Sequence, residues 1–156
     1  MSSDGLRRRV TVRLTLPPRS RQLPRLDSRL LRSRAVRVLR EVGQSNSELS
    51  IAILLDDEIA ALNSEHRGKP SATDVLSFSL LEGEHSDHRG KLLGDVVIGI
   101  ETAARQARAA HRGLGEEVAR LLIHGILHLL GWNHEESAEA KLMRAEERRL
   151  WRAIRS

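Results

Sequence analysis

Three histidines in the C-terminal third of the chain have the spacing of a metal site. They are His124, His128 and His134, in the stretch HGILHLLGWNH. The first two lie four residues apart, so on a helix both imidazoles can reach one ion at ~2.0–2.1 Å, the usual zinc–nitrogen distance. Gly131 favours a left-handed turn that ends the helix and brings His134 back toward the ion. Three protein ligands leave a fourth position for water, which is typical of catalytic zinc.

The residue that follows the first histidine limits this chemistry. Zinc metalloproteases of the HExxH type have their general base at that position, and this chain has Gly125. Zinc alone lowers the pKa of bound water to ~7, so a nucleophile is still available. Proton transfer to an amine leaving group is lost, which disfavours peptide hydrolysis and favours cleavage of a phosphodiester with help from a nearby cation. Glu135 and Glu136 follow the third histidine and keep a metalloprotease open as an alternative.

Hydrophobic periodicity predicts the elements that must position these histidines. The predicted strands cover residues 10–16, 49–55, 75–80 and 95–100, and the predicted helices cover 26–42, 56–66, 102–111, 116–130 and 137–154, the last with Ser137 as its cap. The polar stretch 81–91 predicts a loop. We therefore expect an α+β fold with a mixed four-stranded sheet, about five helices, and a metal-binding helix similar to that of zinc metalloproteases.

The length and composition bound the remaining possibilities. The 156 residues fit one domain, 1–156, whose first 25 residues form a basic segment and the first strand, part of which we expect to be disordered. The absence of cysteine excludes disulfides and thiolate metal sites and fits a reducing compartment. No apolar run approaches the ~20 residues of a membrane span. The basic N-terminus MSSDGLRRRV lacks the apolar segment of a secretory signal.

Charge is unevenly distributed along the chain. Residues 1–40 contain twelve arginines and two acids, a net of +10, whereas residues 41–156 contain fourteen basic and nineteen acidic residues, a net of −5. Such asymmetry indicates a basic face that meets a polyanion, although the same arginines also fit the solvated face of a helix. The aromatic residues are only Phe78, Trp132 and Trp151, which disfavours a platform for stacking single-stranded bases.

The histidine signature and three further segments resemble the YbeY family, bacterial endoribonucleases of ribosomal RNA maturation. HGILHLLGWNH is similar to the family signature HGxLHLxGxDH. LNSEHRGKPSATDVLSFSL from Leu62, LLGDVVIGIETAARQA from Leu92 and EEVARLLIHGILHLLG from Glu116 also resemble the family, in the same order. The resemblance spans about residues 49–150, and residues 1–48 match weakly.

The resemblance implies a fold, an activity and a set of site residues. The fold is a single α+β domain with one Zn²⁺ ion held by His124, His128 and His134. The activity is cleavage of single-stranded RNA in the cytoplasm, in maturation of the small-subunit rRNA 3′ end and in ribosome quality control. The implied partners are rRNA precursors and the small ribosomal subunit with its proteins, with no DNA and no membrane. The functional arginine of the family falls on Arg67, whose forked donors suit the scissile phosphate.

Two further residues are candidates to orient a ligand histidine. Asp95 begins a predicted strand beside the family's cleft and is either a hydrogen-bond acceptor for a ligand histidine or an ordinary aspartate at a strand end. Asn133 replaces the aspartate that the family has before the third histidine, so it keeps the size and hydrogen bonding of that residue but loses its charge. The loss weakens any step that requires this carboxylate.

Three functions are therefore compatible with the sequence. The first is a zinc-dependent endoribonuclease, and the second is a metalloprotease, which Gly125 disfavours. The third is an assembly factor without catalytic activity, in which a structural zinc supports a fold that docks on rRNA and ribosomal proteins through the basic N-terminal part.

Overall fold

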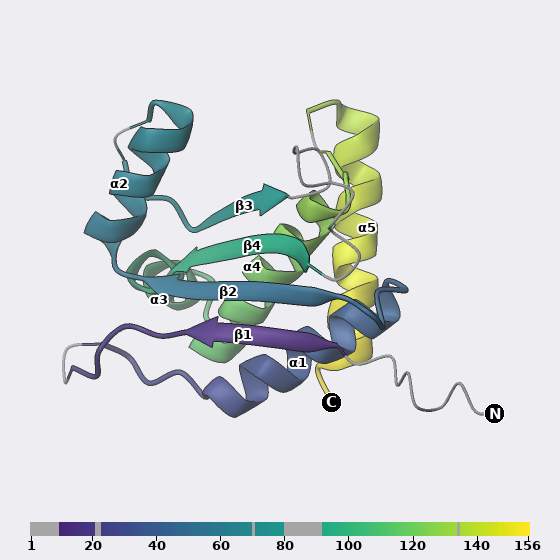
Figure 1. Cartoon of the computed structure of the whole chain (residues 1–156), viewed down its shortest axis with the longest axis horizontal. Helices are drawn as coiled ribbons and strands as arrows, with labels where there is room; N and C mark the ends of the chain where they lie inside the picture. Colours follow the sequence, from purple (N-terminus) through teal and green to yellow (C-terminus); the bar gives the residue numbers. More distant parts are fainter. Residues whose placement is uncertain (1–9, 21–22, 70, 80–91, 134) are drawn as a thin grey trace.

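The predicted strands form one sheet in which alternate residues face a helix-covered core. The computed structural model describes residues 10–20, 23–69, 71–79, 92–133 and 135–156. Its strands are β1 (Thr11–Thr15), β2 (Glu48–Leu54), β3 (Val75–Ser79) and β4 (Leu92–Gly99). Its helices are α1 (Ser28–Glu41), α2 (Asp56–Arg67), α3 (Ile100–Ala109), α4 (Leu114–Leu129) and α5 (Ser137–Ile154) (Figure 1). The predicted α+β fold is confirmed, and the predicted loop 81–91 lies outside the described residues.

The order of the strands places β1 and β3 at opposite edges of the sheet. The order is β1-β2-β4-β3. Strands β1, β2 and β4 are parallel, and β3 is antiparallel to β4. The sheet is therefore mixed, as predicted. Strand β4 begins at Leu92, three residues earlier than the predicted start. Leu92 pairs with Glu48 of β2, and Leu93 is buried in the main core.

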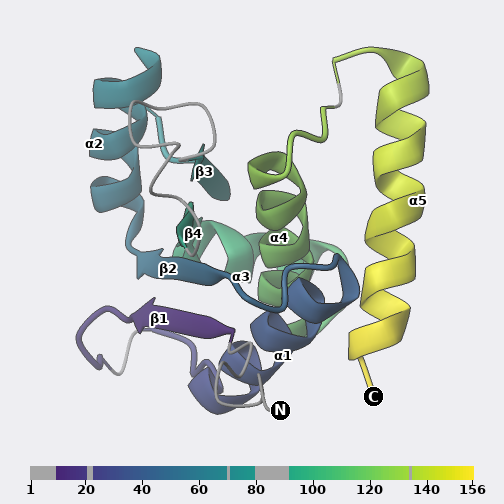
Figure 2. The same ribbon diagram turned by 45° about the vertical axis from the view of Figure 1, so that its right-hand side comes forward.

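The two faces of the sheet are covered differently. Leu49, Ile51 and Ile53 of β2 are fully buried in the main core, which also contains the apolar residues of α1, α4 and α5. The alternate residues of β2 face the other way, where Ala52 packs in a small cluster with Ile59 of α2. Figure 2 shows α4 and α5 on one side of the sheet and α2 on the other.

Helix α4 is the central helix of the main core. Ten of its sixteen residues are buried, which explains its almost continuous apolar sequence. Asp27 caps α1 by accepting a hydrogen bond from the Leu30 amide at 3.1 Å, as expected for an N-cap aspartate. Ser137, predicted as a cap, is instead the first residue of α5, and Glu136 occupies the cap position. In the described residues, no helix has the length and hydropathy that a membrane span needs.

Candidate metal and RNA-cleavage site

His124 and His128 face each other near the end of α4. Their Nε2 atoms are 3.0 Å apart, and their rings meet edge to face with an interplanar angle of 77°. Two nitrogen ligands of a tetrahedral zinc ion are roughly 3.3 Å apart at the usual bond length. The pair can therefore share one ion with only a small adjustment, because the i, i+4 spacing has placed both rings on one face of the helix.

The other ring nitrogen of His124 faces a carboxylate on α5. Glu147 Oε2 lies 2.8 Å from His124 Nδ1, and both side chains are about a quarter exposed, at 26% and 28%. A carboxylate oxygen at this distance accepts a hydrogen bond from Nδ1–H, and this contact favours the tautomer whose lone pair is on Nε2. This is the tautomer that a metal ligand needs, and a carboxylate behind a ligating histidine is a recurrent feature of zinc sites.

The donor set that the structure describes fits a zinc ion but is incomplete. His134, the third predicted ligand, lies outside the described residues. Among the residues that are described, no three His, Cys, Asp or Glu side chains form a group able to hold a metal. Two imidazole nitrogens that converge on one point, one of them backed by a carboxylate, are borderline-soft donors of the kind that zinc prefers.

Helix α4 ends at a glycine in the left-handed conformation. Gly131 has φ 94°, and its amide donates to the His128 carbonyl at 3.0 Å. The Trp132 amide donates to the Leu127 carbonyl at 3.0 Å. These two bonds form the Schellman motif, which ends helices with a left-handed residue, usually glycine. The turn predicted at Gly131 is therefore confirmed.

Asn133 closes the next turn with its side chain. Its Oδ1 accepts a hydrogen bond from the Glu135 amide at 2.8 Å, so the two residues that flank position 134 are tied together. An amide oxygen and a carboxylate oxygen can both accept this bond. The exchange of aspartate for asparagine at this position is therefore compatible with the turn.

At Gly125, α4 packs directly against the sheet. A Cβ atom at this position would be 2.7 Å from Cγ1 of Val96 on β4 and 3.1 Å from Oγ of Ser77 on β3. The Ser77 hydroxyl donates to the Gly125 carbonyl at 3.0 Å, which holds the helix against β3. The structure thus leaves no room for the glutamate that an HExxH protease has at this position.

Arg67 is an exposed residue at the end of α2. The preceding residue, His66, packs edge-on against the Phe78 ring of β3, with 5.0 Å between the ring centroids. Strand β3 therefore contacts both the end of α2 and α4. In Figure 1 the end of α2 and the start of α5 rise on either side of β3.

Asp95 lies on the face of the sheet away from α4. It pairs in register with Phe78, and its neighbour Val96 points toward Gly125. Because side chains alternate along a strand, Asp95 faces the side that α2 covers. Among the described residues, the carboxylate that contacts His124 is that of Glu147.

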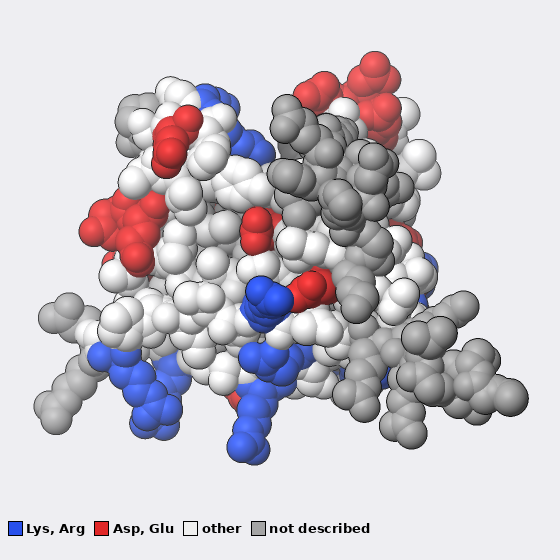
Figure 3. Space-filling model, viewed as in Figure 1, with Lys and Arg blue, Asp and Glu red and all other residues white. Residues whose placement is uncertain are grey.

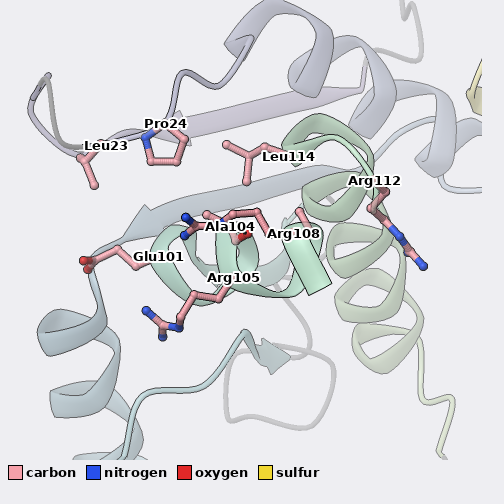
Figure 4. A pocket seen from close by; sticks show the side chains of 9 residues that line it. Leu23, Pro24, Glu101, Ala104, Arg105, Arg108, Arg112 and Leu114 are labelled. Atoms are coloured by element: carbon pink, nitrogen blue, oxygen red, sulfur yellow. Dashed lines mark hydrogen bonds between the residues drawn. The ribbon is translucent and has the colours of Figure 1, made fainter. Parts of the chain in front are cut away.

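A surface hollow of about 480 Å³ lies elsewhere, between residues 23–24 and α3. Figure 4 shows Leu23, Pro24 and Leu114 on one side of it and α3 on the other. Two of its arginines are paired: Arg105 with Asp56 at 2.9 Å and Arg112 with Glu117 at 3.4 Å. Neither histidine of the pair lines this hollow, so it is separate from the candidate site.

Glu147 was not predicted from the sequence, although a signal was present. The buried residues of α5 are Met143, Leu150 and Ile154. Glu147 follows Met143 by four residues and precedes Leu150 by three, so it is an acid on the apolar stripe of an amphipathic helix. An acid at such a position requires a partner, and that partner is His124.

Comparison with known proteins assigns the family. The family model described as Endoribonuclease YbeY matches residues 20–155. Endoribonuclease YbeY of Anaeromyxobacter sp. (strain Fw109-5) is 49% identical over 145 residues, which cover 92% of this chain and 72% of that protein. The protein of the same name from Geobacter sulfurreducens is 37% identical over 142 residues, which cover 90% of this chain and 94% of the relative. The solution structure of TM1509 from Thermotoga maritima matches with TM-score 0.63 and 25% identity, covering 92% of this chain and 89% of that one.

Proposed function

Because this chain belongs to the YbeY endoribonuclease family, we propose that it is a zinc-dependent enzyme that cleaves single-stranded RNA. The enzyme would act in the cytoplasm. Its roles would be maturation of the small-subunit rRNA 3′ end and ribosome quality control. Its partners would be rRNA precursors and the small ribosomal subunit. The observation that carries the zinc dependence is the pair of Nε2 atoms 3.0 Å apart, with Glu147 behind His124.

Each residue of the site has a distinct part in this proposal. His124 and His128, with His134, would hold the ion, and Glu147 would keep His124 in the ligating tautomer. A zinc ion bound there would supply a Lewis acid and a water molecule of lowered pKa. Arg67 would bind the scissile phosphate through two of its N–H groups and offset the negative charge that develops during cleavage.

Gly125 supports RNA rather than peptide as the substrate. The protease mechanism needs a glutamate at this position to transfer a proton to the departing amine, and the contacts with Val96 and Ser77 exclude one. Cleavage of a phosphodiester expels an alkoxide, whose charge a nearby guanidinium can offset. Chelator-sensitive cleavage of casein by the zinc-loaded protein would be the observation that restores the metalloprotease.

Cleavage of an end-labelled single-stranded RNA with a small-subunit rRNA 3′ extension tests the proposal. We expect His128→Ala to abolish cleavage and to lower the bound zinc. We expect Arg67→Ala to lower the rate by about 10²-fold, as for removal of one transition-state donor, and to leave bound zinc unchanged. Arg108→Ala is the matched control, because Arg108 is also an exposed arginine in a helix, α3.

The same experiment separates enzyme from assembly factor. Full cleavage by both His128→Ala and Arg67→Ala, purified in the same way as wild type, would mean that a contaminant cuts the RNA. RNA binding without turnover by the zinc-loaded wild type would favour the noncatalytic assembly factor.

A further inference from the structure

We propose that this protein has a second RNA-binding surface, at the edge of the sheet opposite the histidine pair. The surface, called the arginine face below, consists of four residues of β1, the following loop and α1: Arg13, Arg19, Arg25 and Arg29. It would bind RNA phosphates without reading sequence and would supply most of the electrostatic affinity for RNA. The inference rests on the proposed function only in taking RNA as the ligand.

The net charge of the remaining chain opposes RNA binding. Residues 41–156, which include Arg67 and the histidines, carry a net charge of −5. The residues described between 10 and 40 contain eight arginines and one acid, Asp27. Proteins attract nucleic acid mainly through cations that neutralise phosphates. The affinity must therefore come largely from the N-terminal part.

The arginines of the face are available for a ligand. Arg19, Arg25 and Arg29 are exposed, and none forms an ion pair with a residue in the described ranges. Arg13 pairs with Glu48, but its side chain is 74% exposed, and ion pairs of this kind contribute little. Figure 3 shows blue side chains gathered along the lower edge of the molecule, where β1 and the residues that follow it lie.

Other arginines of the same region have structural contacts instead. Arg37 donates to the Ala153 and Ile154 carbonyls at the end of α5. Arg34 stacks on the Trp151 ring, 5.1 Å from its centroid. Arg32 donates to the Val12 carbonyl, which fixes α1 beside β1. These three arginines of α1 thus make contacts within the fold, whereas the arginines of the arginine face are exposed to solvent.

The start of α5 has the opposite charge. Glu135, Glu136 and Glu139 are exposed at the start of α5, and Figure 3 shows acidic side chains on that lobe. An RNA bound only at the site would meet these carboxylates, and the end of α2 presents two exposed cations near Arg67, namely Arg67 itself and Lys69. A contact at a second, basic surface would offset this repulsion.

The position of the arginine face predicts a dependence on RNA length. Strands β1 and β3 are separated by β2 and β4, and three spacings between neighbouring strands amount to about 14 Å. An RNA that occupies the site must extend beyond this distance to reach the arginine face. Long RNA substrates should therefore bind more tightly than short ones. Once bound, long and short substrates should be cleaved at the same rate.

RNA binding to the triple variant Arg19→Gln/Arg25→Gln/Arg29→Gln tests the inference. Binding is measured in the full-length His128→Ala chain, so that cleavage does not interfere and failure of the proposed catalysis does not affect the result. We expect affinity for an RNA of ~16 nucleotides to fall about tenfold, and the salt dependence of log K to lose about 2 units of slope, as three lost phosphate contacts predict. Affinity for an RNA of ~4 nucleotides should not change.

Two control variants make the result specific. The triple Arg→Lys variant keeps the charge and should keep both the affinity and the salt slope. The variant Arg144→Gln/Arg148→Gln/Arg152→Gln removes the same charge from exposed positions of α5 and should lose much less affinity. Equal losses from the two Gln triples, or unchanged RNA binding by the first, would overturn the proposal. Thermal unfolding checks that each variant is folded.

Discussion

The histidine pair and Arg67 lie on two helices that differ in how much of each helix is buried in the core. Helix α4 buries ten of its sixteen residues and carries His124 and His128. Helix α2 buries only Ile59 and Asn63 of its twelve residues and carries Arg67 at its exposed end. Two ligands of one ion need a fixed separation, whereas a guanidinium that binds phosphate tolerates adjustment. Substitutions around the metal site should therefore change the stability of the fold, whereas substitution of Arg67 should leave it nearly unchanged.

Gly125→Glu should have the largest effect, because it introduces a side chain where α4 packs directly against the sheet. The new side chain would meet Val96 and Ser77 in a space that already excludes a Cβ atom. Overpacking typically costs about 1–3 kcal/mol, and a buried unpaired carboxylate costs several kcal/mol more. We expect the variant to be unfolded or insoluble, and Gly125→Ala to lose about 1–3 kcal/mol in denaturant unfolding.

A second glycine of the same helix is the control for this prediction. A Cβ atom at Gly115 would be no closer than 3.8 Å to any neighbour, which is an ordinary contact. Gly115→Ala should therefore be neutral, or stabilising by up to about 1 kcal/mol through helix propensity. Similar stabilities for Gly125→Ala and Gly115→Ala would show that α4 is not tightly packed on the sheet.

Glu147→Ala should weaken zinc binding without unfolding the protein. Loss of the carboxylate behind His124 removes the bond that selects the ligating tautomer, and the loss of such partners typically costs 10–100-fold in metal affinity. Glu147→Gln should lose less, because its amide oxygen still accepts from Nδ1. Competition with a coloured chelator measures the zinc affinity.

Glu146→Ala is the matched control, because its carboxylate contacts Arg149 and not the histidine. The hydrogen bond from Arg149 lowers the pKa of Glu146. Its small contribution to stability is therefore present above its unfolded pKa and is lost as the pH falls through the folded value. Zinc affinity that falls equally in Glu146→Ala and Glu147→Ala would contradict the assigned role of Glu147.

Substitution of Glu117 should give the smallest effect. This residue lies at the end of α4 opposite the histidines. Burial raises the pKa of this carboxyl above 4.5, although Arg112 and Arg120 act in the other direction. The folded protein therefore binds the proton more tightly than the unfolded chain. This contribution to stability is complete below pH 4.5 and is lost as the pH rises through the folded pKa.

Glu117→Gln removes this pH dependence. Relative to wild type, the variant should gain stability between pH 4.5 and pH 7, by less than about 1 kcal/mol. Denaturant unfolding at the two pH values measures the change. A relative loss at pH 7 would mean that the ion pair with Arg112 outweighs the cost of burial.

Local patterns in the sequence determined much of this protein. Alternation and helical spacing predicted every described strand and helix to within a few residues, since each depends on neighbours along the chain. The i, i+4 histidines and the turn at Gly131 were predictable for the same reason. The segments from Leu62 to Gly131 carried the family resemblance, which the comparisons confirm. The third ligand, His134, stays a prediction.

Contacts between distant segments were decided only by the tertiary structure. The partner of His124 is 23 residues away on another helix, and the space beside Gly125 is set by two strands. The face on which Asp95 lies depends on where α4 packs, which no local pattern contains. The arginines of residues 1–40 fitted both a binding face and an ordinary solvated helix. The order of the strands decides the position of that charge. It places β1, which lies beside the arginines, and β3, which contacts α4, at opposite edges of the sheet.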